Sequence, residues 1–335
     1  MEYNEHEAKM TDQIKVAFIY DPNYSFLNGT HFDKTTYYFF MHALKRNKKI
    51  NVTYFPASEK FDVTQLNGKY DIILLPNNFH EGSPKILDGI ETTSIPVISR
   101  VGDPHDIKWK NKIPYHKKFK INYYFNFMDS TYFYKFYPKD FKYRTIVFGL
   151  EPSLYKNLKP YDKRIKNKIL NSGAVGKTTL KSRIANRILN PQRSGWYFYK
   201  LRTMCNSLSY VDYNGIVDGK YMFENYIDML SSYCASIAAT TYYPTIKYWE
   251  IPASGCLTFM EITEQNAGNY LGFIDGKTAI FIDEFNYKTK FQEFLNSSDD
   301  PKWKKIAKDG QEFSLQNHSN DNAVNNLVNL MEEIL

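Results

Sequence analysis

The chain has 335 residues, of which 43 are Lys or Arg and 36 are Asp or Glu, so its formal net charge at pH 7 is +7. This length favours two domains, and a hydrophobic share of 43% supplies enough apolar side chains for two packed cores. Three cysteines without metal-ligand spacing argue against a disulfide scaffold and for thiols in a reducing compartment. The polar start of the chain does not look like a secretory signal, and no uncharged apolar run in the sequence is long enough to span a bilayer. We therefore expect a cytoplasmic protein whose mild basic excess suits an anionic ligand, with charge for solubility alone as the alternative.

Strands and helices alternate through the first half of the chain. Apolar runs rich in β-branched and aromatic residues predict strands at 14–20, 50–56, 70–78, 95–100, 121–127 and 143–149. Helical spacing predicts helices at 35–49 and 83–91. This alternation predicts right-handed βαβ units around a parallel sheet.

A polar segment with two prolines, residues 149–168, breaks this rhythm, and the alternation then restarts. We predict a strand at 168–175, further strands at 234–240, 256–262 and 278–283, and an amphipathic helix at the end of the chain. The predicted fold is therefore α/β, with two Rossmann-like doubly wound domains facing across a cleft. The predicted domains are 1–150 and 151–335, and the terminal helix can cross back to the first. Ligands of such sheets bind beyond the carboxyl ends of the strands, so one substrate, the acceptor, can bind against the first domain and a second, the donor, against the second.

The stretch NSGAVGKTTL, residues 171–180, partly matches a phosphate-binding Walker A loop. The first glycine of that motif would stand at 171, which is Asn171, so hydrolysis by a P-loop enzyme is disfavoured. A strand, a small-residue turn and a helix still suit a diphosphate, because the first amides of the helix are unpaired. We expect Gly173 to let a phosphate approach the backbone, and Lys177 and Lys181 to add positive charge. An ordinary turn with solvated lysines is the alternative.

A second candidate site lies in residues 242–261, where a proline-containing turn opens a short helix. Thr245 is a possible cap of that helix. Lys247 can form an ion pair with a phosphate or a carboxylate. Glu250 can accept hydrogen bonds from both hydroxyls of a ribose. A surface helix with a solvated Glu250 is the alternative.

Candidates for the acceptor side stand in the first half. Asp103 and His105, in the RVGDPHD segment after a predicted strand, could take a proton from an acceptor hydroxyl. Asp-Pro is equally a turn signal. His31 is the next candidate, although a loop histidine is more often solvated.

The most basic stretch, residues 105–124, interleaves lysines with aromatic rings, among them Lys108 and Trp109. This pattern suits a nucleic acid or another polyanion. A solvated charged surface is the alternative.

Several blocks of the second half resemble the C-terminal domain of GT-B glycosyltransferases. They are KYWEIPASGCLTFMEITEQ, LGFIDGKTAIFID and a helix ending near His318 and Ser319; the SGAVGKTTLKSRI and VFGLEPSLY segments are also similar. The likeness is greatest to the CgeB-like, spore-protein branch of the group 1 transferases. That family often has Tyr-Pro-Leu-Arg at the head of the helix after the turn, where this chain has Thr178-Thr179-Leu180-Lys181, and lysine loses the bidentate fork of arginine.

The resemblance implies a transferase that moves a sugar from a nucleotide-sugar, such as a UDP-sugar, to an acceptor hydroxyl. It implies that the donor site is lined by Ser172, Gly173, Lys247, Tyr248 and Glu250. Helix N-termini and lysines would stabilise the leaving diphosphate, and we expect neither a bound metal nor a cofactor. His31, Lys108 and Trp109 are the acceptor-side candidates, and an anionic acceptor such as DNA or a polymer follows if the basic stretch binds it. A non-catalytic nucleotide- or nucleic-acid-binding module that uses 105–124 is the alternative.

Overall fold

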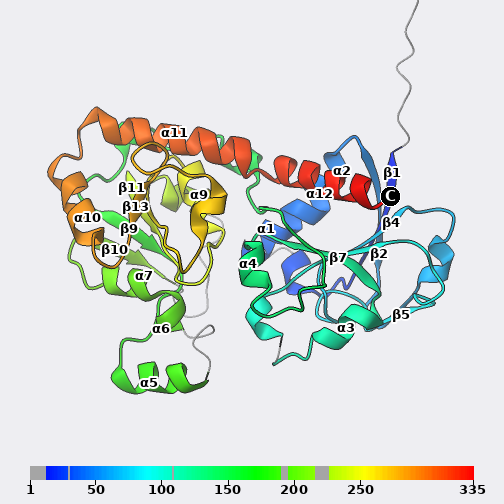
Figure 1. Ribbon diagram of the computed structural model, residues 1–335. Helices are drawn as coiled ribbons and strands as arrows, with labels where there is room; N and C mark the ends of the chain where they lie inside the picture. The colour runs from blue at the N-terminus through cyan, green and yellow to red at the C-terminus, as the bar shows by residue number, and fades with distance from the viewer. Residues whose placement is uncertain (1–12, 29–30, 108, 190–194, 216–225) are drawn as a thin grey trace, which may run out of the picture.

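A computed structural model describes residues 13–28, 31–107, 109–189, 195–215 and 226–335. Within these residues the chain forms a six-stranded and a five-stranded sheet, both parallel, and a small pair of strands, β3 (Lys60–Asp62) and β5 (Ile86–Asp88). Figure 1 shows the two larger sheets in separate halves of the molecule.

The first sheet has the strand order β2-β1-β4-β6-β7-β8. Its strands are β1 (Ile14–Tyr20), β2 (Ile50–Pro56), β4 (Ile72–Leu75), β6 (Val97–Arg100), β7 (Ile121–Asn126) and β8 (Tyr143–Thr145). The predicted strands of the first half are thus confirmed. The direction of strand addition reverses between β1 and β4, and ligands of open α/β sheets bind beyond the carboxyl ends of the strands at such a point.

The predicted helix at 83–91 was wrong. Residues Ile86–Asp88 form β5 and pair in register with β3. Gly82 and Gly89 flank this segment with φ values of +111° and +73°, a backbone region that L side chains avoid and a helix does not use. The apolar spacing that suggested a helix therefore belongs to a short strand between two turns.

The predicted helix at 35–49 is present in three joined pieces. It begins in α1 (His31–Tyr37), continues as a π-helical stretch, η2 (Tyr38–Ala43), and ends in α2 (Leu44–Arg46). Phe39 and Phe40 on this stretch are fully buried, and Phe40 stacks on Phe18 of β1 with ring centroids 4.9 Å apart. This packing fixes the segment across one face of the first sheet.

The second sheet has the order β10-β9-β11-β12-β13. Its strands are β9 (Ile169–Ser172), β10 (Val211–Asn214), β11 (Ala235–Ala238), β12 (Leu257–Glu261) and β13 (Ile280–Ile282). Its direction of strand addition reverses between β9 and β11, so the turn after β9 lies at a second switch point.

The helices of the chain cover the sheets and link the two halves. Those not yet given are α3 (Ile113–Lys118), α4 (Ser130–Phe133), α5 (Leu180–Leu189), α6 (Gly195–Phe198), α7 (Lys200–Cys205), α8 (Tyr226–Leu230), α9 (Lys247–Ala253), α10 (Tyr287–Asn296), α11 (Pro301–Asn317) and α12 (Asn320–Ile334). Among the described residues, none of these helices combines the length and the apolar character that a membrane crossing requires.

The terminal helix α12 returns to the first half of the molecule, as Figure 1 shows. Its buried side chains, including Val324, Leu327 and Met331, join the core that contains Phe39 and Phe148. Arg46 in α2 bonds to Asp321 at the start of the helix. This crossing joins the two halves and holds their carboxyl edges toward one another.

Candidate functional site

A cavity of about 330 Å³ lies between the two sheets. Its walls come from residues that follow β4, β6 and β7 of the first sheet and β9 and β11 of the second, together with side chains of α7 and the start of α9. The charged groups that line it are Glu81, Arg100, Asp103, Asp106, Lys110, Lys112, Arg202 and Lys247. These are five cations and three carboxylates, so the cavity suits an anionic ligand.

The turn after β9 brings two cations close to a glycine. Gly173 has φ of +91°, and a Cβ at this position would lie 2.7 Å from Lys247 Cε and 3.1 Å from Arg202 Nη2. Glycine therefore meets both demands of this turn, the backbone angle and the space for the two cations. A phosphate at this turn could contact a guanidinium and an ammonium together.

Arg202 was missed by the sequence analysis and is fully buried beneath the turn. Its Nε donates to Asn171 Oδ1 at 3.1 Å, its Nη2 donates to the Ser172 carbonyl, and Asn171 Nδ2 donates to the Arg202 carbonyl at 2.9 Å. Asn171, the residue that breaks the Walker A pattern, thus fixes Arg202 in place. Burial lowers the pKa of Arg202, but a guanidinium keeps its charge in proteins.

Lys247 and Glu250 lie one turn apart on α9 and are both more than nine-tenths buried. Lys247 Nζ donates to the Tyr226 hydroxyl at 2.8 Å and lies 3.4 Å from Ser172 Oγ, and the Tyr226 hydroxyl lies 3.5 Å from Glu250 Oε2. Burial lowers the pKa of Lys247, with a further lowering by Arg202, while Glu250 acts in the opposite direction. Burial raises the pKa of Glu250, and Lys247 partly offsets that rise.

Glu250 faces a second cavity, of about 250 Å³. Thr35 lines both cavities, so the two adjoin, and Lys247 lines the first while Glu250 lines the second. Tyr38 and Tyr155 contribute aromatic rings to the second cavity. Lys247 therefore places a cation in the first cavity, and Glu250 places a carboxylate in the second.

Lys177 and Lys181 do not lie beside the turn, which corrects the expectation that they add charge there. Residues 174–179 form neither helix nor strand, and α5 begins only at Leu180, so its first amides are not at the end of β9. Both lysines are exposed, and Lys177 lines a separate surface cavity with Gly195 and Trp196. Arg202 and Lys247 supply the charge at the turn instead.

Two residues of the 242–261 segment are placed differently from the expectation. Tyr248 is fully buried, and its hydroxyl donates to the Glu261 carbonyl at 3.0 Å while accepting from the Thr240 amide at 3.0 Å. It supports the loop after β11 and does not line the cavity. Thr245 does line the first cavity, but its side chain does not cap α9, which begins without a side-chain cap.

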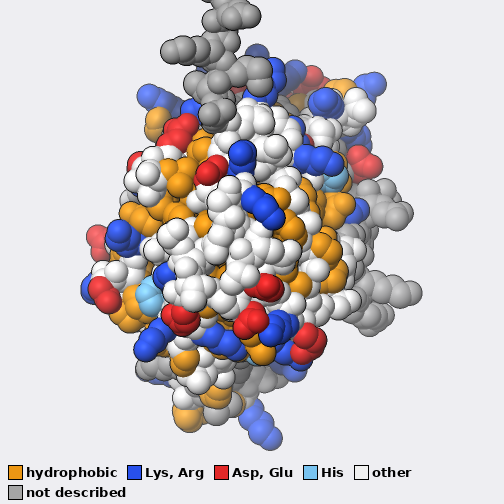
Figure 2. All heavy atoms as spheres, turned by 90° about the vertical axis from the view of Figure 1, so that its right-hand side faces the viewer, with side chains coloured by type: hydrophobic (Ala, Val, Ile, Leu, Met, Phe, Trp, Pro, Cys, Tyr) orange, Lys and Arg blue, Asp and Glu red, His pale blue; other side chains and the backbone are white. Residues whose placement is uncertain are grey.

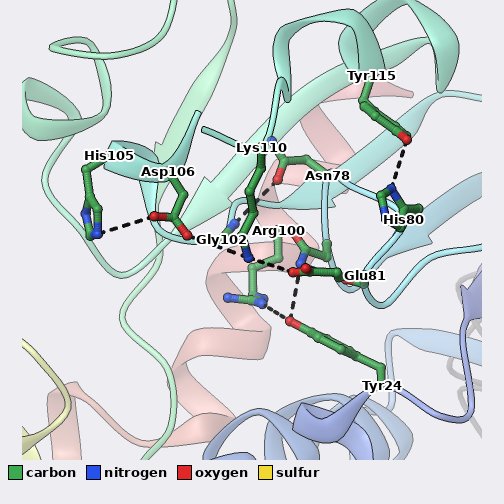
Figure 3. A network of polar contacts seen from close by, with 11 residues as sticks. Tyr24, Asn78, His80, Glu81, Arg100, Gly102, His105, Asp106, Lys110 and Tyr115 are labelled. Carbon is green, nitrogen blue, oxygen red and sulfur yellow. Dashed lines mark hydrogen bonds and ion pairs between the residues drawn. The ribbon is translucent and has the colours of Figure 1, made fainter. Parts of the chain in front are cut away.

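The two candidates for the acceptor base are separated by the structure. Asp103 is exposed in the cavity, and its Oδ1 accepts a hydrogen bond from Tyr243 of the opposite half at 3.2 Å. The His105 side chain is buried behind this wall, with Nε2 3.8 Å from Asp106 Oδ1, as Figure 3 shows. Asp103 can therefore meet a ligand, whereas His105 lies outside the cavity lining.

Of the remaining acceptor-side candidates, only the side chain of Trp109 lies among the described residues. Trp109 is 64% exposed and outside its lining, Lys108 lies outside the described residues, and His31 is the first residue of α1 with a side chain that is not described. In the 105–124 stretch, Phe119 and Tyr124 belong to a hydrophobic core packed against the first sheet.

The aromatic rings of this stretch therefore do not form a continuous stacking surface. On the face shown in Figure 2, Lys and Arg are interspersed with Asp and Glu, so the basic excess is not collected there into one patch.

Known structures share this architecture. HepE from Anabaena, solved with UDP and glucose, matches 96% of this chain and 100% of its own, with a TM-score of 0.54 and 12% identity. Sucrose-phosphate synthase from Thermosynechococcus elongatus matches 96% of this chain and 99% of its own, with a TM-score of 0.59 and 12% identity. An α-glucosyltransferase solved with UDP-glucose and DNA containing an abasic site matches 96% and 100%, with a TM-score of 0.57 and 10% identity.

These likenesses show that the chain has the α/β fold of GT-B glycosyltransferases, as predicted. Residues 175–329 match the model of a family described as glycosyl transferase-like. No curated protein matches the sequence significantly. The family match covers the half of the chain that carries Arg202, Lys247 and Glu250.

Replacing Gly173 by alanine tests the geometry of the turn. The methyl group would meet Lys247 Cε at 2.7 Å, and an L residue at this φ carries a strain of about 1–3 kcal/mol. We expect a lower Tm and an affinity for inorganic pyrophosphate, used as a diphosphate probe, that is at least about tenfold weaker, since both cations must shift. Thermal unfolding and isothermal calorimetry measure the two effects. Gly276→Ala, also at positive φ but with open space around it, is the matched control and should lose stability only. Unchanged pyrophosphate affinity in Gly173→Ala would contradict a role of this turn in binding an anion.

Proposed function

We propose that this protein is a glycosyltransferase that transfers a sugar from a UDP-sugar to an acceptor hydroxyl. The observation that carries the proposal is the meeting of Gly173, Arg202 and Lys247 at a switch point, with Glu250 one helical turn away. Two buried cations suit a diphosphate, and a buried carboxylate suits the hydroxyls of a ribose. The block of residues around Lys247 and Glu250 further supports a place in the CgeB-like branch of the group 1 transferases.

The donor lies across both cavities in this proposal. Its diphosphate contacts Arg202 and Lys247 in the first cavity, with the sugar directed toward Asp103. Its ribose bonds to Glu250, and the base occupies the second cavity near the rings of Tyr38 and Tyr155. The UDP and UDP-glucose in the solved structures of HepE and the α-glucosyltransferase support this choice of nucleotide.

The reaction exchanges one bond at the anomeric carbon of the sugar. The bond from that carbon to the diphosphate oxygen breaks, a bond to the acceptor oxygen forms, and the proton of the acceptor hydroxyl passes to Asp103. Negative charge grows on the leaving diphosphate, and cations already fixed by the fold stabilise it without reorganising. Arg202 and Lys247 supply this stabilisation, and we propose that the reaction needs no bound metal.

A calorimetric panel of UDP, GDP, ADP and TDP, followed by UDP-sugars, tests the proposal. We expect UDP to bind, and at least one UDP-sugar to be hydrolysed slowly or transferred, with rates unchanged after treatment with EDTA. Binding without any turnover would favour a nucleotide-binding module instead. A failure of all four nucleotides to bind would contradict the proposal.

A further inference from the structure

The wall of the first cavity that belongs to the first domain holds two buried cations that the donor site does not use. Arg100 ends β6 and is 7% exposed; Lys112 precedes α3 and is 3% exposed. Both line the cavity, on the side opposite Arg202 and Lys247. Charged groups this deeply buried are normally paired with an opposite charge.

Neither cation has a carboxylate partner among the described residues. Arg100 donates to the Tyr24 hydroxyl at 2.7 Å, as Figure 3 shows. It also donates to the Pro76 carbonyl at 2.8 Å and the Val101 carbonyl at 3.3 Å, and all three acceptors are neutral. The Lys112 ammonium makes no hydrogen bond or ion pair within the described part of the chain.

Lys110, which lies between Arg100 and Lys112 in the sequence, does have carboxylate partners. Its Nζ lies 2.8 Å from Glu81 Oε2 and 3.6 Å from Asp106 Oδ2, so two carboxylates already compensate its charge (Figure 3). Burial lowers the pKa of Lys112 to about 8, and Asp103 and Asp106 act against this without contacting the ammonium. Lys110 and, more weakly, Arg100 add to the lowering of the pKa, as neighbouring positive charges do.

The space in front of Lys112 is kept open by a glycine. A Cβ on Gly102 would lie 2.9 Å from Lys112 Nζ and 3.4 Å from Asn77 Oδ1. Asn77 Oδ1 is itself buried without a hydrogen-bond partner. Two cations without a contacting carboxylate and an unused acceptor oxygen therefore lie on the same wall of the cavity.

We propose that Arg100 and Lys112 bind an anionic group, a phosphate or a carboxylate, carried by the acceptor, while Asn77 accepts a hydrogen bond from one of its hydroxyls. This assignment rests on the proposed transfer reaction, because only a second substrate would occupy this wall beside the donor. An anion here compensates the charge of both cations. The acceptor would thus be a hydroxyl compound with a nearby phosphate or carboxylate.

Binding of inorganic phosphate to protein saturated with UDP tests the assignment. Titrations followed by ³¹P NMR compare wild type with Lys112→Met and with Lys305→Met, an exposed surface lysine on α11 as the control. We expect Lys112→Met to weaken phosphate binding at least about tenfold. UDP affinity should stay within about twofold, and Tm should rise because an unpaired buried charge is removed. Lys305→Met should leave all three values unchanged.

Gly102→Ala gives a second variant, which fills the space beside the ammonium and leaves both charges in place. It should also weaken phosphate binding. Phosphate binding that is unaffected in both variants, or that UDP displaces in the wild type, would overturn the assignment, since the anion would then sit elsewhere or be that of the donor.

Two further comparisons separate the source of the anion from the proposed function itself. Glycerol 3-phosphate should bind to UDP-saturated protein more tightly than glycerol, and Lys112→Met should abolish the difference. If Lys112→Met instead weakens UDP-glucuronic acid but not UDP-glucose, the anion belongs to the donor sugar and the acceptor assignment is overturned. If UDP does not bind at all, the proposed function fails, whereas phosphate titration of the nucleotide-free protein still decides whether Lys112 binds an anion.

Discussion

Replacing Lys247 by methionine will lower the rate of sugar transfer from a UDP-sugar by about 10²- to 10³-fold, because it removes a fixed cation from the leaving diphosphate. Lys247 Nζ is held by the Tyr226 hydroxyl at 2.8 Å and stands beside Gly173, so its charge is in place before the bond breaks. The methionine side chain is similar in length and suits the buried position. Steady-state transfer or donor hydrolysis measures the loss, and circular dichroism checks that the fold is kept.

Lys181→Met and Lys177→Met are the matched comparisons, since each also removes one positive charge. Both lysines are exposed, and neither lines the first cavity. We expect their rates to stay within about twofold of the wild type, as for most surface substitutions. Losses in these two variants equal to that of Lys247→Met would contradict the placement of the diphosphate at Gly173.

Replacing Glu250 by glutamine will weaken the binding of UDP-glucose by about tenfold or more, because a hydrogen bond to a charged group contributes about 1.5–3 kcal/mol. The change also leaves the buried Lys247 without the carboxylate that favours its charged form. Calorimetry at neutral pH measures the loss. The carboxylate of Glu293, exposed on α10, is the matched control, and Glu293→Gln should bind UDP-glucose as the wild type does.

The pH dependence of the same binding identifies the role of Glu250. Burial raises the pKa of this carboxyl, so it is ionised only above that raised value. Affinity for UDP-glucose should therefore fall as the pH drops through the raised pKa of Glu250. Glu250→Gln should remove this fall in affinity at low pH. Affinity should also fall at higher pH, because the lowered pKa of Lys247 lets its ammonium lose a proton there, and Lys247→Met should remove that second fall. A fall at low pH that persists in Glu250→Gln would show that another group titrates.

Much of the fold could be predicted because the strands of parallel sheets are buried on both faces. Runs such as Ile72–Leu75 are then apolar at every position and easily found. The prediction of a helix around Ile86–Asp88 was wrong because three residues are too few to show the alternation of a strand. The two flanking glycines at positive φ decide the conformation of this segment.

The sequence pointed to those residues of the candidate site that stand in a recognisable local pattern. The Ser-Gly turn after β9 and the Lys-x-x-Glu spacing on α9 led to Gly173, Lys247 and Glu250. Arg202 reaches the same turn from a separate helix, beside the buried Leu201 and Cys205, and nothing in its neighbours marks it as facing a ligand. Lys112 lies in the basic stretch 105–124, for which the sequence left open a polyanion site or a solvated surface, and only the fold shows that Lys112 is buried.

A crystal structure of the protein soaked with UDP-glucose tests the central claim most directly. We predict density for the diphosphate within hydrogen-bond distance of Arg202 and Lys247, with the ribose hydroxyls at Glu250 and the base in the adjoining cavity. Density for the nucleotide beside Lys177 and Trp196, or on the wall formed by Arg100 and Lys112, would contradict it.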